Sequence, residues 1–144
     1  MVFKHNALPF HNRAVPAAMA SECAREQGKF WEMHDKIFTN VRALEDADLE
    51  GHAKSVGLNM GNWKSCYTSN KHKARLDADQ KQATLLGARG TPAFFINGRF
   101  LSGAQPYPAF EALVEEELKK AKATGLSGSD YYAKEIEAKG LKKP

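Results

Sequence analysis

The sequence predicts an α/β protein in which about five helices precede a β-hairpin and a further helix. Apolar residues recur with helical spacing from about residue 14 to residue 87. Two short apolar runs then flank Asn97-Gly98, and this dipeptide between two such runs is the strongest short signal for a hairpin. At 144 residues, the chain has the length of one globular domain.

The first half of the chain is predicted to be a short strand followed by the block of helices. Val2–His5 has the pattern of a strand that enters a loop at Asn6-Ala7-Leu8-Pro9. Capping residues, glycines and apolar spacing then divide the following residues into separate amphipathic helices. These are predicted from Ala14 to Gly28, from Phe30 to Thr39, from Ala47 to Val56, after the N-cap Asn59, and from Lys71 to Leu86.

The second half begins with the hairpin, whose strands are predicted at Ala93–Ile96 and Arg99–Ser102. A helix from Tyr107 to Lys122 is predicted next, with its apolar stripe on one face. Residues 124–129 are rich in Gly and Ser, which predicts a hinge before a short amphipathic tail that contains Tyr131, Tyr132 and Ile136.

The net charge of +4 comes from the C-terminal residues 119–144. No arginine cluster or repeated aromatic accompanies the lysines there, so a solvated tail is predicted and no nucleic-acid partner is expected. The sequence contains no apolar run of 18 residues, so no membrane span is predicted. Residues 1–5 also lack the pattern of a signal peptide. The seven lysines of this region are Lys119, Lys120, Lys122, Lys134, Lys139, Lys142 and Lys143.

Four stretches of the sequence, in this order, resemble the DsbA-like disulfide oxidoreductases over roughly residues 1 to 122. The resemblance implies a thioredoxin fold with a helical domain inserted between its two halves. It also implies a substrate-binding loop at Gly90-Thr91-Pro92 with a cis Thr91–Pro92 bond, extended or unfolded polypeptide substrates, and a periplasmic or cell-envelope location. The stretches are Leu8-Pro9-Phe10-His11, Gln27-Gly28-Lys29-Phe30-Trp31-Glu32-Met33-His34-Asp35, Gly90-Thr91-Pro92-Ala93-Phe94-Phe95-Ile96-Asn97-Gly98-Arg99 and Gly103-Ala104-Gln105-Pro106.

The chain departs from the family pattern in one respect, because it contains no Cys-x-x-Cys motif. In the family this motif follows a first strand and opens the first helix, upstream of the strand that matches Val2–His5. The predicted fold is therefore an incomplete thioredoxin-like fold, with residues 1–12 and 88–124 as a partial core. Residues 13–87 are predicted to be the all-helical insertion, and residues 125–144 a basic tail with a short helix.

The strand that precedes the motif lies centrally in the family's sheet, so its absence leaves two backbone ladders without partners. Unpaired backbone groups are costly when buried. We therefore expect Val2–His5 to shift and pair antiparallel with Ala93–Ile96, in preference to a homodimer formed through the incomplete sheet.

Cys23 and Cys66 lie within predicted helices and on stripes that face the core. They are expected either to stay buried as free thiols or to form a structural disulfide, and a catalytic role is not predicted. No metal or cofactor is predicted, because no pair of histidines has the spacing of a zinc site. The histidines are His5, His11, His34, His52 and His72, of which His34 is expected to pack against Phe30, Trp31 and Phe38.

Three functions remain open from the sequence. The first is part of a thiol-disulfide oxidoreductase domain, inactive in redox chemistry by itself because the Cys-x-x-Cys is absent. The second is a redox-inert module that binds an extended peptide by strand addition at Thr91. The third is a glutathione-using relative of the same fold, in which Ser replaces the first cysteine of the motif.

Overall fold

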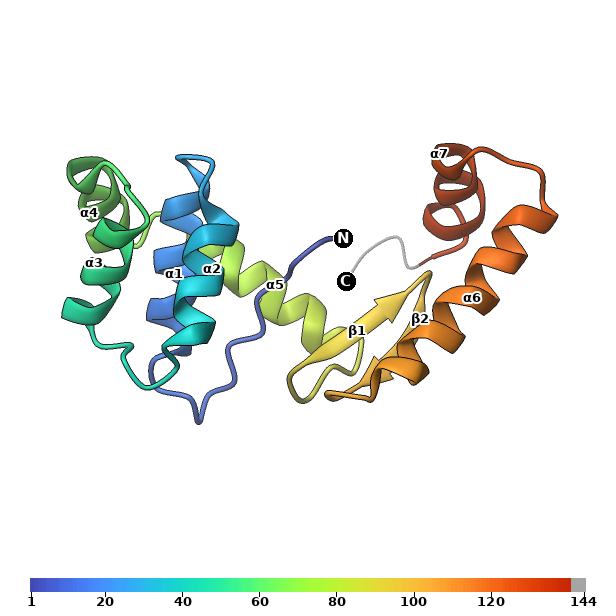
Figure 1. The fold of residues 1–144 in the computed structure, drawn as a ribbon, viewed down its shortest axis with the longest axis horizontal. Helices are drawn as coiled ribbons and strands as arrows, with labels where there is room; N and C mark the ends of the chain where they lie inside the picture. The colour runs from blue at the N-terminus through green and yellow to red at the C-terminus, as the bar shows by residue number, and fades with distance from the viewer. Residues whose placement is uncertain (141–144) are drawn as a thin grey trace. The chain divides into compact units, whose positions relative to one another are not determined.

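The computed structural model describes residues 1–140, and the chain divides into two compact units. The first unit, Met1–Lys81, is helical, and the second begins at Gln82 and contains the β-hairpin (Figure 1). No helix within residues 1–140 has the length and apolar character needed to cross a bilayer. The fold is thus mostly helical, with a single two-stranded antiparallel sheet among the described residues.

Helix α1 (Ala14–Arg25) is the centre of the first unit, where it packs against α2 (Phe30–Thr39), α3 (Asp46–Ser55) and α4 (Met60–Thr68) (Figure 1). The predicted helix boundaries are confirmed to within about two or three residues, and those of α2 agree at both ends. Local signals set these ends. Gly28 follows α1 with φ of +72°, and the Asn59 side chain accepts a hydrogen bond from the Asn62 N–H at 3.0 Å at the start of α4.

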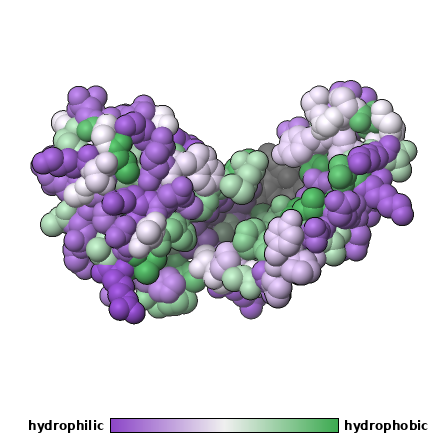
Figure 2. All heavy atoms as spheres, viewed as in Figure 1, coloured by the Kyte–Doolittle hydropathy of each residue, from purple (hydrophilic) through white to green (hydrophobic). Residues whose placement is uncertain are grey.

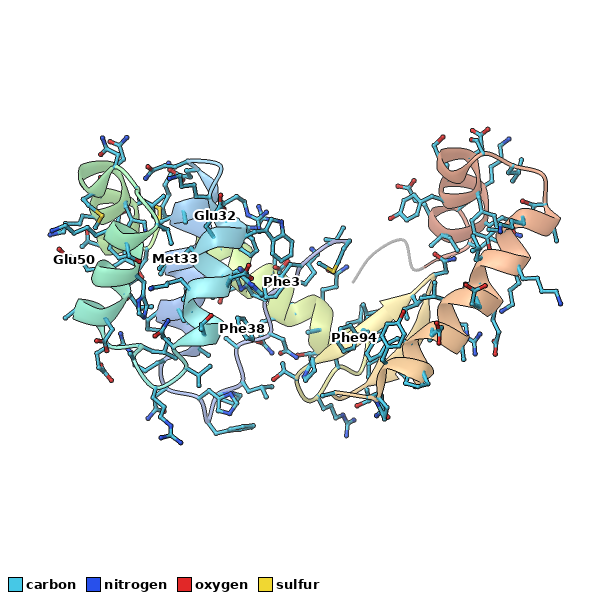
Figure 3. All side chains as sticks on the ribbon, in the orientation of Figure 1. Phe3, Glu32, Met33, Phe38, Glu50 and Phe94 are labelled. Atoms are coloured by element: carbon cyan, nitrogen blue, oxygen red, sulfur yellow. A yellow bond between two sulfur atoms is a disulfide. The ribbon has the colours of Figure 1, made fainter. Side chains whose placement is uncertain are left out.

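The core of the first unit is formed by the inward faces of these helices, with Met33 of α2 among its fully buried residues (Figure 3). Trp63 of α4 is the largest of these residues, and its indole N–H donates to the Ala20 carbonyl of α1 at 3.1 Å. The ring of Trp63 also stacks on that of Tyr67, with the centroids 4.8 Å apart. The polar end of the tryptophan is therefore satisfied inside an otherwise apolar contact.

The second unit contains the predicted hairpin, β1 (Ala93–Ile96) and β2 (Arg99–Ser102). Asn97 and Gly98 have φ of +49° and +84°, the pair of positive angles that defines a type I′ turn. Helix α5 (Lys73–Leu85) runs from the first unit into the second.

Helix α6 (Tyr107–Ala123) packs on one face of the hairpin (Figure 1). Phe94, labelled in Figure 3, meets Phe110 of α6 edge to face at 4.8 Å, and Arg99 pairs with Glu116 and Glu117 of the same helix. The predicted tail helix is present as α7 (Gly128–Tyr131), followed by a π-helical turn from Tyr132 to Glu137. Lys142 and Lys143 lie outside the described residues.

The N-terminal segment forms no strand, so the prediction of a strand at Val2–His5 that pairs with β1 is wrong. Side chains of the helical unit bind this segment instead. The His5 backbone N–H donates to Asp79 Oδ2 at 3.0 Å, and the Lys4 ammonium donates to Asp79 Oδ1 at 2.9 Å. Phe3, labelled in Figure 3, packs among the rings of Phe30, Trp31 and His34. Side-chain contacts therefore hold the segment on the helical unit without a neighbouring strand.

A fully buried carboxylate, Glu22 of α1, contacts the same segment through His5. It is 2.8 Å from His5 Nε2, and it accepts from Arg25 at 2.9 and 3.0 Å. Arg75 of α5 approaches it at 3.2 Å. Burial raises the pKa of Glu22, but the hydrogen bonds and charges of His5 and Arg25 outweigh burial and lower this pKa to about 2.

We predict that ionised Glu22 stabilises the fold and that this contribution is lost in acid. Its pKa is near 4.5 in the unfolded chain and about 2 in the folded chain, so its contribution is present above pH 4.5 and is lost as the pH falls towards 2. The shift corresponds to about 3 kcal/mol of the free energy of unfolding. Urea unfolding of the parent chain and of Glu22→Gln at several pH values measures this contribution by difference.

The matched control is Glu50→Gln, which removes a half-exposed carboxylate paired with Lys64. This control is expected to change the free energy of unfolding by less than about 1 kcal/mol. If the parent and Glu22→Gln lose stability equally between pH 4.5 and pH 2, the role given to the buried carboxylate is incorrect.

Candidate functional site

The loop Gly90-Thr91-Pro92 leads directly into β1, where the sequence predicted a substrate-binding loop. All three residues are exposed, and the peptide bond between Thr91 and Pro92 is cis. The Pro92 carbonyl accepts from the Gly103 N–H at 2.9 Å, which extends the β1–β2 ladder by one hydrogen bond. The loop is therefore held by the hairpin while its residues remain accessible.

The strand that follows this loop has one open edge. Ile96 and Arg99 flank a two-residue turn and form a hydrogen-bonded pair, so pairing alternates from there along the ladder. The backbone groups of Phe94 and Ile96 consequently face β2, whereas those of Ala93 and Phe95 point away from it. Within residues 1–140, no other strand pairs with this second edge.

The edge of β1 also lacks the usual protection against pairing. Natural edge strands commonly carry a charged residue, a proline or a bulge, and β1 consists of four apolar residues, Ala93-Phe94-Phe95-Ile96. The sheet face opposite α6 carries Phe95 and Phe100, which are 42% and 46% exposed and lie 5.0 Å apart between ring centroids. Figure 2 shows hydrophobic residues gathered over this part of the second unit.

The two cysteines form a disulfide, which decides between the two states that the sequence left open. Cys23 of α1 and Cys66 of α4 are both buried, and their Cα atoms are 5.8 Å apart. Each lies two residues before the end of its helix. A helix C-terminus disfavours a thiolate, whereas reactive cysteines are favoured at a helix N-terminus.

His72 lies beside the disulfide, in the turn between α4 and α5. One ring nitrogen of His72 and the sulfur atoms of Cys23 and Cys66 all lie within 4.8 Å of one another. His72 Nε2 is 2.7 Å from Glu26 Oε1, and Lys71 donates to the same oxygen at 2.9 Å. The hydrogen bonds from Lys71 and His72 lower the pKa of Glu26 against the opposing effect of burial.

The sequence did not predict this cluster, because its members come from three different elements and two of them are 43 residues apart. A search for short Cys/His spacings does not find such a set. A surface cavity of about 320 Å³ opens next to it and is lined by Cys66 together with Glu26, Lys71 and other polar residues. As predicted, His34 belongs to an aromatic cluster instead, where it stacks on Phe38 with the ring centroids 4.4 Å apart.

Comparisons with known proteins relate most of the chain to one family. Residues 2–115 match the family model described as the DSBA-like thioredoxin domain. The chain is 36% identical over 114 residues to the Na⁺/H⁺ antiporter NhaA 1 of Salinispora arenicola, a match that covers 78% of this chain and 18% of that protein. It is 37% identical over 108 residues to the Na⁺/H⁺ antiporter NhaA of Herminiimonas arsenicoxydans, with 75% and 17% covered.

A third relative, the Na⁺/H⁺ antiporter NhaA 3 of Salinispora tropica, is 34% identical over 130 residues, which is 90% of this chain and 20% of that protein. The chain thus spans about a fifth of the length of these relatives. The antiport activity in their names belongs to those longer proteins.

Proposed function

Because this chain belongs to the family of DSBA-like thioredoxin domains, we propose that it is the polypeptide-binding part of a thiol-disulfide oxidoreductase domain. In this proposal, residues 1–12 and 88–124 are an incomplete thioredoxin-like core, and residues 13–87 are its helical insertion. The redox-active Cys-x-x-Cys belongs to a segment outside these 144 residues. The loop Gly90-Thr91-Pro92 then contacts the substrate.

The open edge of β1 is the observation that best supports polypeptide binding by these 144 residues. The backbone groups of Ala93 and Phe95 point away from β2 with the spacing that a further strand requires. A two-stranded sheet is marginal in water, and a third strand adds both hydrogen bonds and burial. An extended polypeptide that runs past Thr91 and along this edge meets both needs.

The substrate class follows from the same geometry. Hydrogen bonds to backbone groups do not depend on the substrate's side chains, so many extended or unfolded sequences fit this edge. Alternate side chains of an added strand lie on the face that carries Phe95 and Phe100, which favours apolar residues at those positions. Unfolded polypeptides expose such residues together with free backbone groups.

A second candidate function is a redox-inert peptide-binding module, which uses the same edge without any redox partner. The positions of Cys23 and Cys66 near helix C-termini and inside a buried disulfide favour it over a role for these cysteines in catalysis. The loop Gly90-Thr91-Pro92 contacts the substrate in both candidates. The edge of β1 stays available to the peptide only in the redox-inert module, because in the oxidoreductase the family's absent strand is expected at this edge.

The reading frame upstream of the codon for Met1 separates these candidates. A strand followed by Cys-x-x-Cys supports the oxidoreductase, and Ser in place of the first cysteine supports a glutathione-using relative. A frame that ends without either motif supports the redox-inert module.

We predict that the 144-residue chain alone does not catalyse insulin reduction by dithiothreitol. Neither cysteine is placed at a helix N-terminus, and both are sequestered in the disulfide. The rate is expected to equal that of the Cys23→Ser/Cys66→Ser variant, with the parent chain alkylated after reduction as a second control. Turnover by the parent that alkylation abolishes would assign catalysis to these cysteines and contradict the proposal.

We also predict that the edge of β1 binds an extended peptide through alternate backbone N–H groups. The probe is a fluorescein-labelled eight-residue peptide of alternating Val and Thr, made in two N-methylated forms that block either the odd or the even N–H groups. Because only every second residue of an added strand bonds to its neighbour, one form should bind at least about tenfold more weakly than the other. Fluorescence polarisation measures both affinities.

Equal affinities of the two N-methylated peptides would show that strand addition is not the mode of binding. A homodimer formed through the same edge is the competing occupant, and sedimentation of the chain alone detects it. If the chain is a dimer that the peptide dissociates, the edge is confirmed as the binding surface. A dimer that the peptide does not dissociate would show that the dimer contact or the peptide contact lies outside this edge.

A further inference from the structure

Two sulfur atoms and an imidazole are brought together inside the helical unit, whereas the proposed substrate-binding loop belongs to the second unit. Cys23 and Cys66 are buried, His72 is half-buried, and the three candidate ligand atoms lie within 4.8 Å of one another. We propose that these three residues bind Zn²⁺ when the disulfide is reduced.

The chemistry of this ligand set fits zinc. Thiolate sulfur and imidazole nitrogen are preferred zinc ligands, and two Cys with one His plus a water molecule is an established coordination set. Tetrahedral geometry places two zinc-bound sulfur atoms about 3.8 Å apart, a distance that follows from zinc–sulfur bonds of about 2.3 Å. Reduction lets the side chains of Cys23 and Cys66 rotate to this separation while α1 and α4 stay in place.

The surroundings of His72 resemble those of a metal ligand. A metal-bound histidine usually has its other ring nitrogen hydrogen-bonded to a carboxylate, which fixes the orientation of the ring. Glu26 occupies this position, with its Oε1 2.7 Å from His72 Nε2, so Nδ1 is the nitrogen left to bind zinc. Lys71 is paired with the same carboxylate, and its charge is therefore neutralised next to the site.

The cavity beside Cys66 supplies an entry path and room for the fourth ligand. Its volume is about 320 Å³, and Ser65 and Ser69 of its polar lining flank the cysteine in sequence. A water molecule from this cavity completes the coordination sphere, and two thiolates balance the charge of the metal.

The redox step needs a reductant, for which we take a dithiol. Its two sulfur atoms are oxidised to a disulfide, and two electrons and two protons pass to Cys23 and Cys66, whose sulfur–sulfur bond breaks. Zn²⁺ then displaces both thiol protons, which go to solvent. A link between α1 and α4 is thereby present in both redox states, first as a covalent bond and then through the metal.

The test compares zinc binding by the oxidised and the reduced full chain. In the test a phosphine takes the place of the dithiol: it is oxidised to the phosphine oxide, and water supplies the oxygen and the two thiol protons. The reduced protein is desalted without oxygen, mixed with one equivalent of zinc chloride and desalted again. Atomic emission is expected to give one zinc per reduced chain and none per oxidised chain. Competition with a chromophoric chelator should show that His72→Gln weakens binding at least about tenfold, whereas the exposed His11→Gln leaves the affinity unchanged.

Because His72→Gln keeps both cysteines, its oxidised form is expected to fold and serves as a check on the variant. Circular dichroism is expected to show that zinc raises the melting temperature of the reduced parent. The rise should be larger than that for reduced His72→Gln. Equal zinc affinity of the parent and His72→Gln, zinc bound by the oxidised chain, or less than about one tenth of a zinc per reduced chain would each overturn the proposal. Retention of copper(I) but not zinc under the same conditions would overturn it as well.

Discussion

Backbone N–H and C=O groups need hydrogen-bond partners, and this requirement governs both regions that matter in the structure. At the N-terminus, the Asp79 carboxylate accepts from the His5 N–H, and a segment with the pattern of a strand is thereby bound to the helical unit. At β1, no strand of the described residues satisfies the backbone groups of Ala93 and Phe95 on the edge away from β2. Asp79 provides the partner in the first region, whereas at β1 the unpaired backbone groups remain available to a binding partner.

The helical unit holds its segments together by three different kinds of contact. Trp63 joins α4 to α1 through packing and a hydrogen bond to Ala20, and the disulfide joins the same two helices covalently. Glu22, fully buried, joins α1 to the N-terminal segment and to α5 through His5, Arg25 and Arg75. Packing alone is tolerant of small changes, whereas a buried charge without its partners is costly, so the carboxylate specifies which groups surround it.

Local signals in the sequence predict the hairpin and the helix ends. The hairpin was predicted at its observed residues because Asn97-Gly98 supplies both positive φ angles of a type I′ turn. The helix ends followed from residues such as Gly28 and Asn59, which act within one turn of themselves. Most of the secondary structure could be predicted for this reason.

The remaining features depend on residues that are distant in sequence. The error at Val2–His5 arose because the partner of this segment, Asp79, is 74 residues from His5 and forms no recognisable motif with it. The disulfide could be proposed but not decided, since it depends on the distance between Cys23 and Cys66 across two helices. The position of His72 beside them could not be predicted, because no short spacing links it to Cys23.

We propose that the free edge of β1 receives an extended polypeptide. Hydrogen exchange of individual backbone amides, followed by NMR with and without the Val/Thr peptide, tests it most directly. The Phe95 amide, which points away from β2, is expected to exchange at least about tenfold more slowly in the complex. The Phe94 amide, already bonded to β2, is expected to change much less. Peptide binding that leaves the exchange rate of the Phe95 amide unaltered would show that the peptide does not add as a strand at this edge.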